Sequence, residues 1–160
     1  TKIWRIDVQS SSAELILQKD LNPFRPGPII SPNLKYILYN PATIEDEEIN
    51  RLYLFQVEHS EEKLLYEEKN FPYVVSWFPN SDQFIMLLDQ KVFLGDKEGN
   101  IIPKPQINPN NLINIRWLDS EHYFWVNEEN ELCLEMFEGS DRILITTLGH
   151  IFYDVYDFAP

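Results

Sequence analysis

Cysteine is almost absent from this sequence of 160 residues, and its scarcity limits the chemistry of the chain. Cys133 is the single cysteine, so no disulfide forms within the chain. A zinc site built from several cysteines is excluded for the same reason. Apolar residues are not scarce: a hydrophobic fraction of 44%, with 14% aromatic residues, is ample for a packed core.

Basic residues are also few. Lysine and arginine number 13 against 26 aspartates and glutamates, which gives a formal net charge of −13. Neutralising nucleic-acid phosphates requires clusters of lysine and arginine, and no two basic residues are adjacent here. The composition therefore argues against nucleic acids and anionic membranes as partners. It is compatible with a cationic partner or metal, although acidity also simply keeps a monomer in solution.

Long apolar segments are missing too. No stretch approaches the roughly 18 apolar residues of a membrane span, and no signal peptide is recognisable. We therefore expect no membrane insertion, and the sequence does not indicate a cellular compartment. It opens without methionine on a strand-like run at residues 3–8, so we expect a piece processed or excised from a longer protein.

The sequence does contain a repeat of about 40 residues. Four dipeptides mark it, each directly after an apolar run: Ser31-Pro32, Phe78-Pro79, Leu118-Asp119 and Ala159-Pro160. Their second residues lie 47, 40 and 41 positions apart. A fixed period of this length is typical of chains built from repeated supersecondary units.

Each complete repeat carries four short runs rich in β-branched and aromatic residues, which predict four strands, a to d. The third runs are centred on Tyr53, Phe93 and Cys133, 40 residues apart. Pro-Asn after strand a and glycine-containing segments after strand c predict tight reversals. No window keeps helical spacing through three turns, and the charged segment 43–50 is interpreted as a longer b–c loop.

The apolar runs are often continuous, as in residues 52–55, which indicates sheets covered on both faces. Residues 131–136 differ, because Leu132, Leu134 and Met136 alternate with two glutamates and predict one wetter face. Stacked four-stranded sheets account for this pattern. We predict an all-β fold, a β-propeller of four-stranded antiparallel blades, with about three and a half to four blades and 15 strands.

We interpret the whole chain, residues 1–160, as a single propeller or propeller fragment. Residues 1–25 supply strands c and d of the first blade. The next blades are residues 26–70, 71–110 and 111–148. Residues 149–160 supply a strand a that closes the ring or opens a further blade.

The repeats resemble the WD40-like repeats of the TolB type, in which an aromatic residue precedes Ser-Pro-Asp-Gly and a later strand ends in aspartate. Segments 30–33 and 77–80 match the first part, and Asp7 and Asp96 match the aspartate. Segment 118–121 departs from the pattern, because it contains neither proline nor glycine. The resemblance implies a propeller; such propellers include binding proteins, assembly platforms and gating domains of serine peptidases.

The histidines and turn serines suggest no shared chemical site. His59, His122 and His150 fall at different positions of the repeats, so we do not expect them to converge on a metal or an acid–base pair. Ser31 and Ser120 lie in turns without the Gly-x-Ser-x-Gly context of a nucleophile. We therefore predict no catalytic residue, no metal site and no cofactor.

The b–c insert holds four consecutive acidic residues: Glu45, Asp46, Glu47 and Glu48. Calcium sites need six or more oxygen ligands, usually from spaced residues with a turn glycine, and this run lacks that spacing. The run fits a solvated loop best, and a basic protein partner is the alternative.

Two tryptophans and two proline-rich loops indicate a candidate interaction surface. Trp77 and Trp117 lie 40 residues apart at matching ends of strand a, where packing between blades is the commoner role and a ligand mouth the rarer one. The loops around Pro26 and Pro105 lead into strand a on the same face as the acidic insert. Because stiff loops lose less entropy on binding, we predict that this face contacts a partner.

We predict a non-catalytic binding or scaffold module that recognises a protein or peptide. Two alternatives are open: the non-catalytic propeller domain of a serine hydrolase of the prolyl oligopeptidase kind, and a propeller that binds a sugar or another small ligand. Unpaired blade edges also predict homo-oligomers, in which two copies associate through their open ends.

Overall fold

The computed structural model describes residues 1–21, 26–42, 49–105, 107–112, 115–127, 129–137, 139 and 142–147. Apart from one short 3-10 helix, the regular structure in these residues is antiparallel β-strand. The chain divides into two units, Thr1–Pro109 and Asn110–Pro160. In the part of the chain that is described, no helix is long and apolar enough to cross a membrane.

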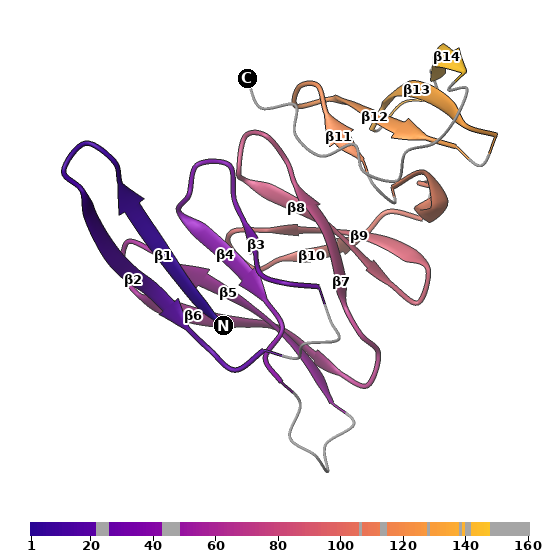
Figure 1. Cartoon of the computed structure of the whole chain (residues 1–160). Helices are drawn as coiled ribbons and strands as arrows, with labels where there is room; N and C mark the ends of the chain where they lie inside the picture. The colour runs from indigo at the N-terminus through magenta and orange to yellow at the C-terminus, as the bar shows by residue number, and fades with distance from the viewer. Residues whose placement is uncertain are drawn as a thin grey trace. The chain divides into compact units, whose positions relative to one another are not determined.

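The first unit contains a two-stranded hairpin and two four-stranded sheets (Figure 1). The hairpin consists of β1 (Lys2–Asp7) and β2 (Ser12–Gln18). The next sheet consists of β3 (Ile29–Ile30), β4 (Tyr36–Tyr39), β5 (Asn50–Gln56) and β6 (Glu61–Glu68). The third consists of β7 (Tyr73–Trp77), β8 (Gln83–Leu88), β9 (Lys91–Asp96) and β10 (Ile101–Pro103). Strands that follow one another in each sheet are hydrogen-bonded neighbours.

The second unit contains one four-stranded sheet in the same consecutive order. The 3-10 helix η1 (Pro109–Leu112) precedes it. Its strands are β11 (Arg116–Trp117), β12 (His122–Val126), β13 (Glu131–Met136) and β14 (Arg142–Thr147). The final strand expected within residues 149–160 lies outside the described residues.

The third strands of the three complete sheets share one register. Tyr53 in β5 pairs with Tyr39, Phe93 in β9 pairs with Met86, and Cys133 in β13 pairs with Trp125. Each of these partners lies two residues beyond the second-strand residue that pairs with the end of strand a. The all-β class and the repeated four-stranded sheet are therefore confirmed, whereas the treatment of residues 1–160 as one domain stays a prediction.

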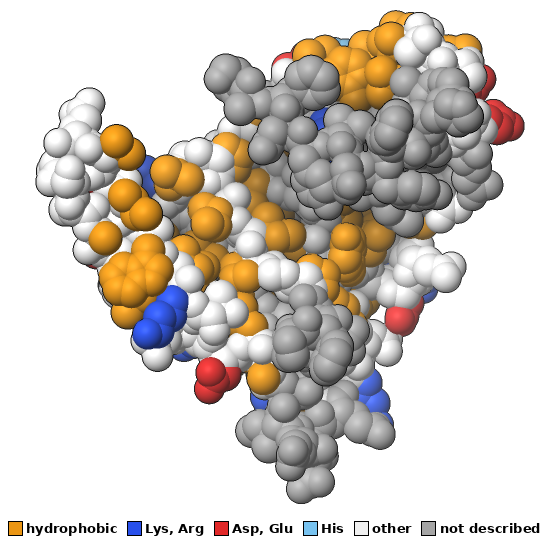
Figure 2. Space-filling view, viewed as in Figure 1, with side chains coloured by type: hydrophobic (Ala, Val, Ile, Leu, Met, Phe, Trp, Pro, Cys, Tyr) orange, Lys and Arg blue, Asp and Glu red, His pale blue; other side chains and the backbone are white. Residues whose placement is uncertain are grey.

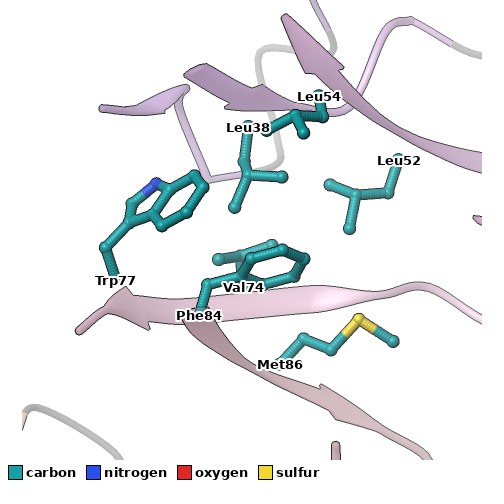
Figure 3. Close-up of a cluster of buried hydrophobic side chains, with 7 residues drawn as sticks. All are labelled: Leu38, Leu52, Leu54, Val74, Trp77, Phe84 and Met86. Carbon is teal, nitrogen blue, oxygen red and sulfur yellow. The ribbon is translucent and has the colours of Figure 1, made fainter. Parts of the chain in front are cut away.

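The β3–β6 sheet is covered on both faces. On one face, Leu38, Leu52 and Leu54 pack with Val74, Trp77, Phe84 and Met86 of the β7–β10 sheet, as Figure 3 shows. On the other face, Ile37, Tyr39 and Phe55 pack with Leu17 of the hairpin. Consecutive residues of β4 and β5 thus enter two different cores, which explains the continuous apolar run of residues 52–55.

The burial of β13 differs from the sequence expectation. Leu132, Leu134 and Met136 are half-buried, and the fully buried side chain of this strand is that of Cys133. The ladder between β13 and β14 shifts register between Leu132 and Cys133, and Cys133 lies directly opposite Trp125. The simple apolar alternation therefore identified the wrong face of β13.

One hydrogen bond recurs in the turns between strands a and b. Asn33 Oδ1 accepts the Lys35 amide at 3.0 Å, and Asn80 Oδ1 accepts the Asp82 amide at 3.1 Å. In the second unit, Asp119 Oδ1 accepts the amide two residues later at 2.8 Å. The segment 118–121, which lacks proline and glycine, therefore keeps the same side-chain brace.

Candidate functional site

Trp77 is an interior residue, placed at the end of β7 with only 3% of its surface exposed. Its ring stacks on Tyr36 with centroids 5.9 Å apart and meets Phe84 edge-on at 5.2 Å. Its indole Nε1 donates a hydrogen bond to the Ile29 carbonyl at 3.2 Å. Trp77 therefore joins the β3–β6 and β7–β10 sheets, and this burial favours the packing role over a ligand mouth.

Trp117 occupies the equivalent end of β11 in the second unit. It is half-buried, and its ring meets Tyr123 edge-on at 5.8 Å and Phe137 at a tilt at 5.7 Å. Trp77 and Trp117 belong to different units, so a shared site for the two stays a prediction. Trp117 packs within the β11–β14 sheet and its following turn, whereas Trp77 joins two sheets of the first unit.

The proline-rich loops lie at the surface. Pro26 and Pro105 are both exposed. The acidic run Glu45, Asp46, Glu47 and Glu48 lies outside the described residues, so its proposed part in an interaction surface stays a prediction. The ends of that insert are described: the Asn40 side chain donates to the Arg51 carbonyl at 2.8 Å and joins them.

The residues directly after β2 contact the described residues that precede this insert. Leu21 forms a β-bridge with Pro41, and the Ala42 amide donates to the Asp20 carbonyl at 2.9 Å. The start of the connection between the hairpin and the β3–β6 sheet and the start of the b–c loop therefore lie side by side in the first unit. This is the edge at which the sequence predicted a contact surface.

The two described histidines belong to different units. His59 is exposed in the turn between β5 and β6. His122 begins β12, and its ring Nδ1 lies 2.9 Å from Asp119 Oδ1. Hydrogen bonds from the Glu121 amide and from His122 hold the pKa of Asp119 below its ordinary value. His150 lies outside the described residues.

Ser31 is a structural residue. It is almost fully buried, its Oγ accepts the Tyr36 amide at 2.9 Å, and it donates to Asn33 Oδ1 at 2.8 Å. The Asn33 amide in turn donates to Ser81 Oγ at 3.0 Å, which links two neighbouring sheets. Among the described residues, no group of three or more histidines, cysteines, aspartates or glutamates is placed to hold a metal ion.

A charged cluster fastens the hairpin to the β3–β6 sheet. Lys19 Nζ lies 2.5 Å from Glu62 Oε1, and the Tyr39 hydroxyl donates to the same oxygen at 2.6 Å. Burial alone would raise the pKa of Glu62, but these two partners outweigh it and lower that pKa. Burial and the Glu62 carboxylate raise the pKa of Tyr39, so its hydroxyl keeps its proton.

Cys133 accepts an unusual pair of donors. Arg142 Nε and Nη2 lie 3.3 Å and 3.1 Å from its Sγ, and the same guanidinium stands 4.9 Å from the centre of the Trp125 ring. The thiol itself is fully buried. This arrangement holds β14 against β13 and presents no reactive group to solvent.

The strongest candidate surface is an apolar patch on the hairpin, visible at the left of Figure 2. We call it the hairpin patch. Its members and exposed fractions are Trp4 at 51%, Ile6 at 68%, Val8 at 85% and Leu15 at 40%. Trp4 pairs directly with Leu15 across the hairpin, and strand alternation places Ile6 on the same side as Trp4. The opposite side carries Ile3, which packs with the core of the next sheet.

Sequence reasoning missed the hairpin patch. It assigned these residues to strands c and d and treated their apolar character as a sign of packing. The available signal was the strand count, since only two strands precede the first complete repeat. Among the described residues, β1 has β2 as its one bonded neighbour.

No protein-family model matches the chain, and no curated protein matches its sequence. The chain is similar to TolB from Acinetobacter baumannii, with 16% identity and a TM-score of 0.59 over 91% of this chain and 38% of that one. It is similar to the β-propeller domain of the Trilobed protease from Pyrococcus furiosus, with 15% identity and a TM-score of 0.51 over 91% and 48%.

A third similar structure is the acylaminoacyl peptidase of Pyrococcus horikoshii, with 12% identity and a TM-score of 0.51 over 89% of this chain and 27% of that one. The chain thus spans less than half the length of each of these three proteins. At such identities the likeness concerns the fold alone. The described sheets have the fold of a partial β-propeller, similar to TolB, with four antiparallel strands in each complete blade.

Proposed function

We propose that this chain is a propeller module that binds a protein or peptide and catalyses no reaction itself. The observation that carries the proposal is the hairpin patch, in which Trp4, Ile6 and Val8 each expose more than half of their surface. Contiguous exposed apolar side chains are typical of protein contact sites. Tryptophan is also enriched among the residues that dominate binding energy at such contacts.

Two aspartates of the first unit, Asp7 and Asp96, have structural hydrogen-bond partners, which is compatible with a binding role. Asp7 accepts the Gln9 amide at 2.9 Å, and Asp96 accepts the Asn100 amide at 2.8 Å. Burial opposes ionisation of Asp96, but hydrogen bonds from Asn100 outweigh it and lower its pKa. Both carboxylates thus brace the turns that follow a third strand.

A second candidate is the non-catalytic propeller domain of a serine hydrolase. The similarity to the propeller of the Trilobed protease and to an acylaminoacyl peptidase favours it. The flanking sequence of the gene decides between the two, because a downstream α/β pattern with Gly-x-Ser-x-Gly would favour the hydrolase. A sugar-binding role draws no support from Trp77, because its ring is buried.

Selection from a displayed peptide library on the immobilised chain tests the proposal. Synthetic versions of the enriched peptides are then titrated by calorimetry, and we expect dissociation constants near micromolar. Trp4→Asp should weaken binding about tenfold or more, since a buried apolar anchor is worth at least ~1.4 kcal/mol. Leu64→Asp, which adds the same charge at another exposed apolar residue, is the control. The proposal fails if no peptide is enriched over a blank surface.

Unpaired blade edges also predict that two copies of the chain associate. Such association would occupy the same hairpin, so it competes with peptide binding. Light scattering at high concentration tests it, and a strict monomer would contradict it.

A further inference from the structure

The β11–β14 sheet has one face that is less deeply buried than the equivalent face of the β3–β6 sheet. Strand register makes three pairs of residues equivalent: Phe124 with Leu38, Leu132 with Leu52, and Leu134 with Leu54. The three leucines of the β3–β6 sheet are at most 4% exposed, whereas their counterparts are only half-buried. Residues that pair across an antiparallel ladder share a face, and two such partners are exposed: Val126 at 38% and Ile143 at 58%. We call these five residues of the second unit the Leu134 face.

The first unit shows what covers such a face. The three leucines pack with four residues of the following sheet: Val74 and Trp77 from β7, and Phe84 and Met86 from β8 (Figure 3). Residues three apart in a regular strand point to opposite sides, but β7 shifts register between Val74 and Ser76. This irregularity brings Val74 and Trp77 to the same side, while Ser76 lies on the other. The first strand of the following repeat thus supplies half of the side chains that cover this face.

The sequence after β14 contains a match to that first strand. Residues 155–158 read Val-Tyr-Asp-Phe and are followed by Ala-Pro, as residues 74–77 are followed by Phe-Pro. Val155 therefore corresponds to Val74, and Phe158 to Trp77. Seven residues link β14 to Val155, whereas five link β6 to Val74, so the connection is long enough. Residues 148–160 lie outside the described residues, and the match is one of sequence.

We propose that residues 155–158 of this chain cover the Leu134 face, with the side chains of Val155 and Phe158 against it and that of Asp157 directed away. The short connection keeps this segment at high effective concentration beside the sheet, an advantage that no separate partner has. A second copy would also have to approach against the repulsion between two chains of net charge −13. The segment thus acts as a strap that closes the apolar core of the second unit.

Photocrosslinking tests this contact in the full chain. A benzophenone side chain replaces Phe158 in one variant and Asp157 in another, and the products are mapped by mass spectrometry. We expect position 158 to attach to peptides that contain Phe124 or Leu134, and we expect that product to be lost from position 157. Attachment of position 158 to the β1–β2 hairpin, equal attachment from both positions, or no attachment would each overturn the inference.

Mixing isotope-labelled with unlabelled chains identifies the occupant of the face. We expect the cross-link to join two parts of one copy. A product that joins a labelled chain to an unlabelled one would identify a second copy as the occupant and would contradict the proposal.

Methyl NMR gives a readout without a bulky probe. An aromatic ring shifts the resonances of methyl groups packed against it, so Phe158→Leu should shift the methyl resonances of Leu132 and Leu134. Phe152→Leu makes the same change outside segment 155–158 and should leave these resonances in place. Resonances that move in neither variant, or equally in both, would show that Phe158 does not pack on this face.

This inference goes beyond the proposed function and does not depend on it. The hairpin patch belongs to the first unit, where Trp4→Asp tests it. If position 158 does not attach to the Leu134 face while selected peptides still discriminate against Trp4→Asp, this inference alone fails. If no peptide is enriched, the proposed function fails whatever the strap does.

Discussion

β5 and β1 are equivalent third strands, and they differ in what surrounds them. β5 is paired on both sides and enters a core on each face. Among the described residues, β1 is paired on one side only, and Ile3 is its one half-buried residue. Both strands contain aliphatic and aromatic residues. The difference shows that neighbouring strands, and not apolar content alone, decide which residues of this repeat are buried.

The largest expected effect lies in the core beneath β5. Phe84→Ala should lower the free energy of unfolding by about 3–5 kcal/mol, because the ring is fully buried and leaves a cavity. Ile6→Ala in β1 should change it by less than about 0.5 kcal/mol. Urea denaturation of both variants measures the contrast. Similar losses would mean that the hairpin patch is buried in solution.

The second effect concerns the fit between β8 and β9. Gly95 pairs directly with Phe84, and a side chain at Gly95 would collide with that ring. Gly95→Ala should therefore cost about 1–3 kcal/mol through overpacking. Gly27→Ala is the control, since a Cβ there meets nothing within 4 Å. Equal stability of the two variants by urea denaturation would contradict this packing of Phe84.

The third effect tests how the hairpin is fastened to the β3–β6 sheet. Glu62→Gln should lower stability by up to about 1 kcal/mol near neutral pH, because the carboxylate is partly solvated. The pKa of Glu62 is lowered in the folded state from its ordinary value of 4.5. Its stabilising contribution is therefore complete above that ordinary value and is lost as pH falls through the folded pKa.

Thermal unfolding from pH 7 down to pH 3 follows that loss. The melting curves of the wild type and of Glu62→Gln should converge at acidic pH. Glu61→Gln, at the neighbouring exposed position of β6, is the control. A gap that widens on acidification would contradict the assigned role of Lys19 and Tyr39.

The smallest effect lies in a turn of the second unit. Asp119→Ala removes the acceptor for the Glu121 and His122 amides and should lower the melting temperature slightly. Asp119→Asn retains an acceptor oxygen, as Asn33 and Asn80 do in the equivalent turns, and should melt closer to the wild type. Indistinguishable melting of Asp119→Ala and the wild type would show that the brace is dispensable.

The sequence predicted those features of the fold that the local residue pattern determines. The spacing of Tyr53, Phe93 and Cys133 indicated the shared third-strand register, because each repeat folds through its own hairpins. The burial of Cys133 was not predictable in this way, since it depends on a register shift against β14 and on Trp125 across the sheet. The exposure of Trp4 and Ile6 was missed because it depends on a neighbouring strand, which no local pattern records.

Residue-resolved hydrogen exchange tests the difference between β5 and β1 most directly. Residues 53–56 of β5 pair with β4 and β6, so their consecutive amides should all be protected. In β1 we expect alternation, with Ile3 and Arg5 protected and Trp4 and Ile6 exchanging rapidly. Uniform protection along β1 would contradict its pairing with β2 alone among the described strands, and alternation along β5 would contradict the four-stranded sheet.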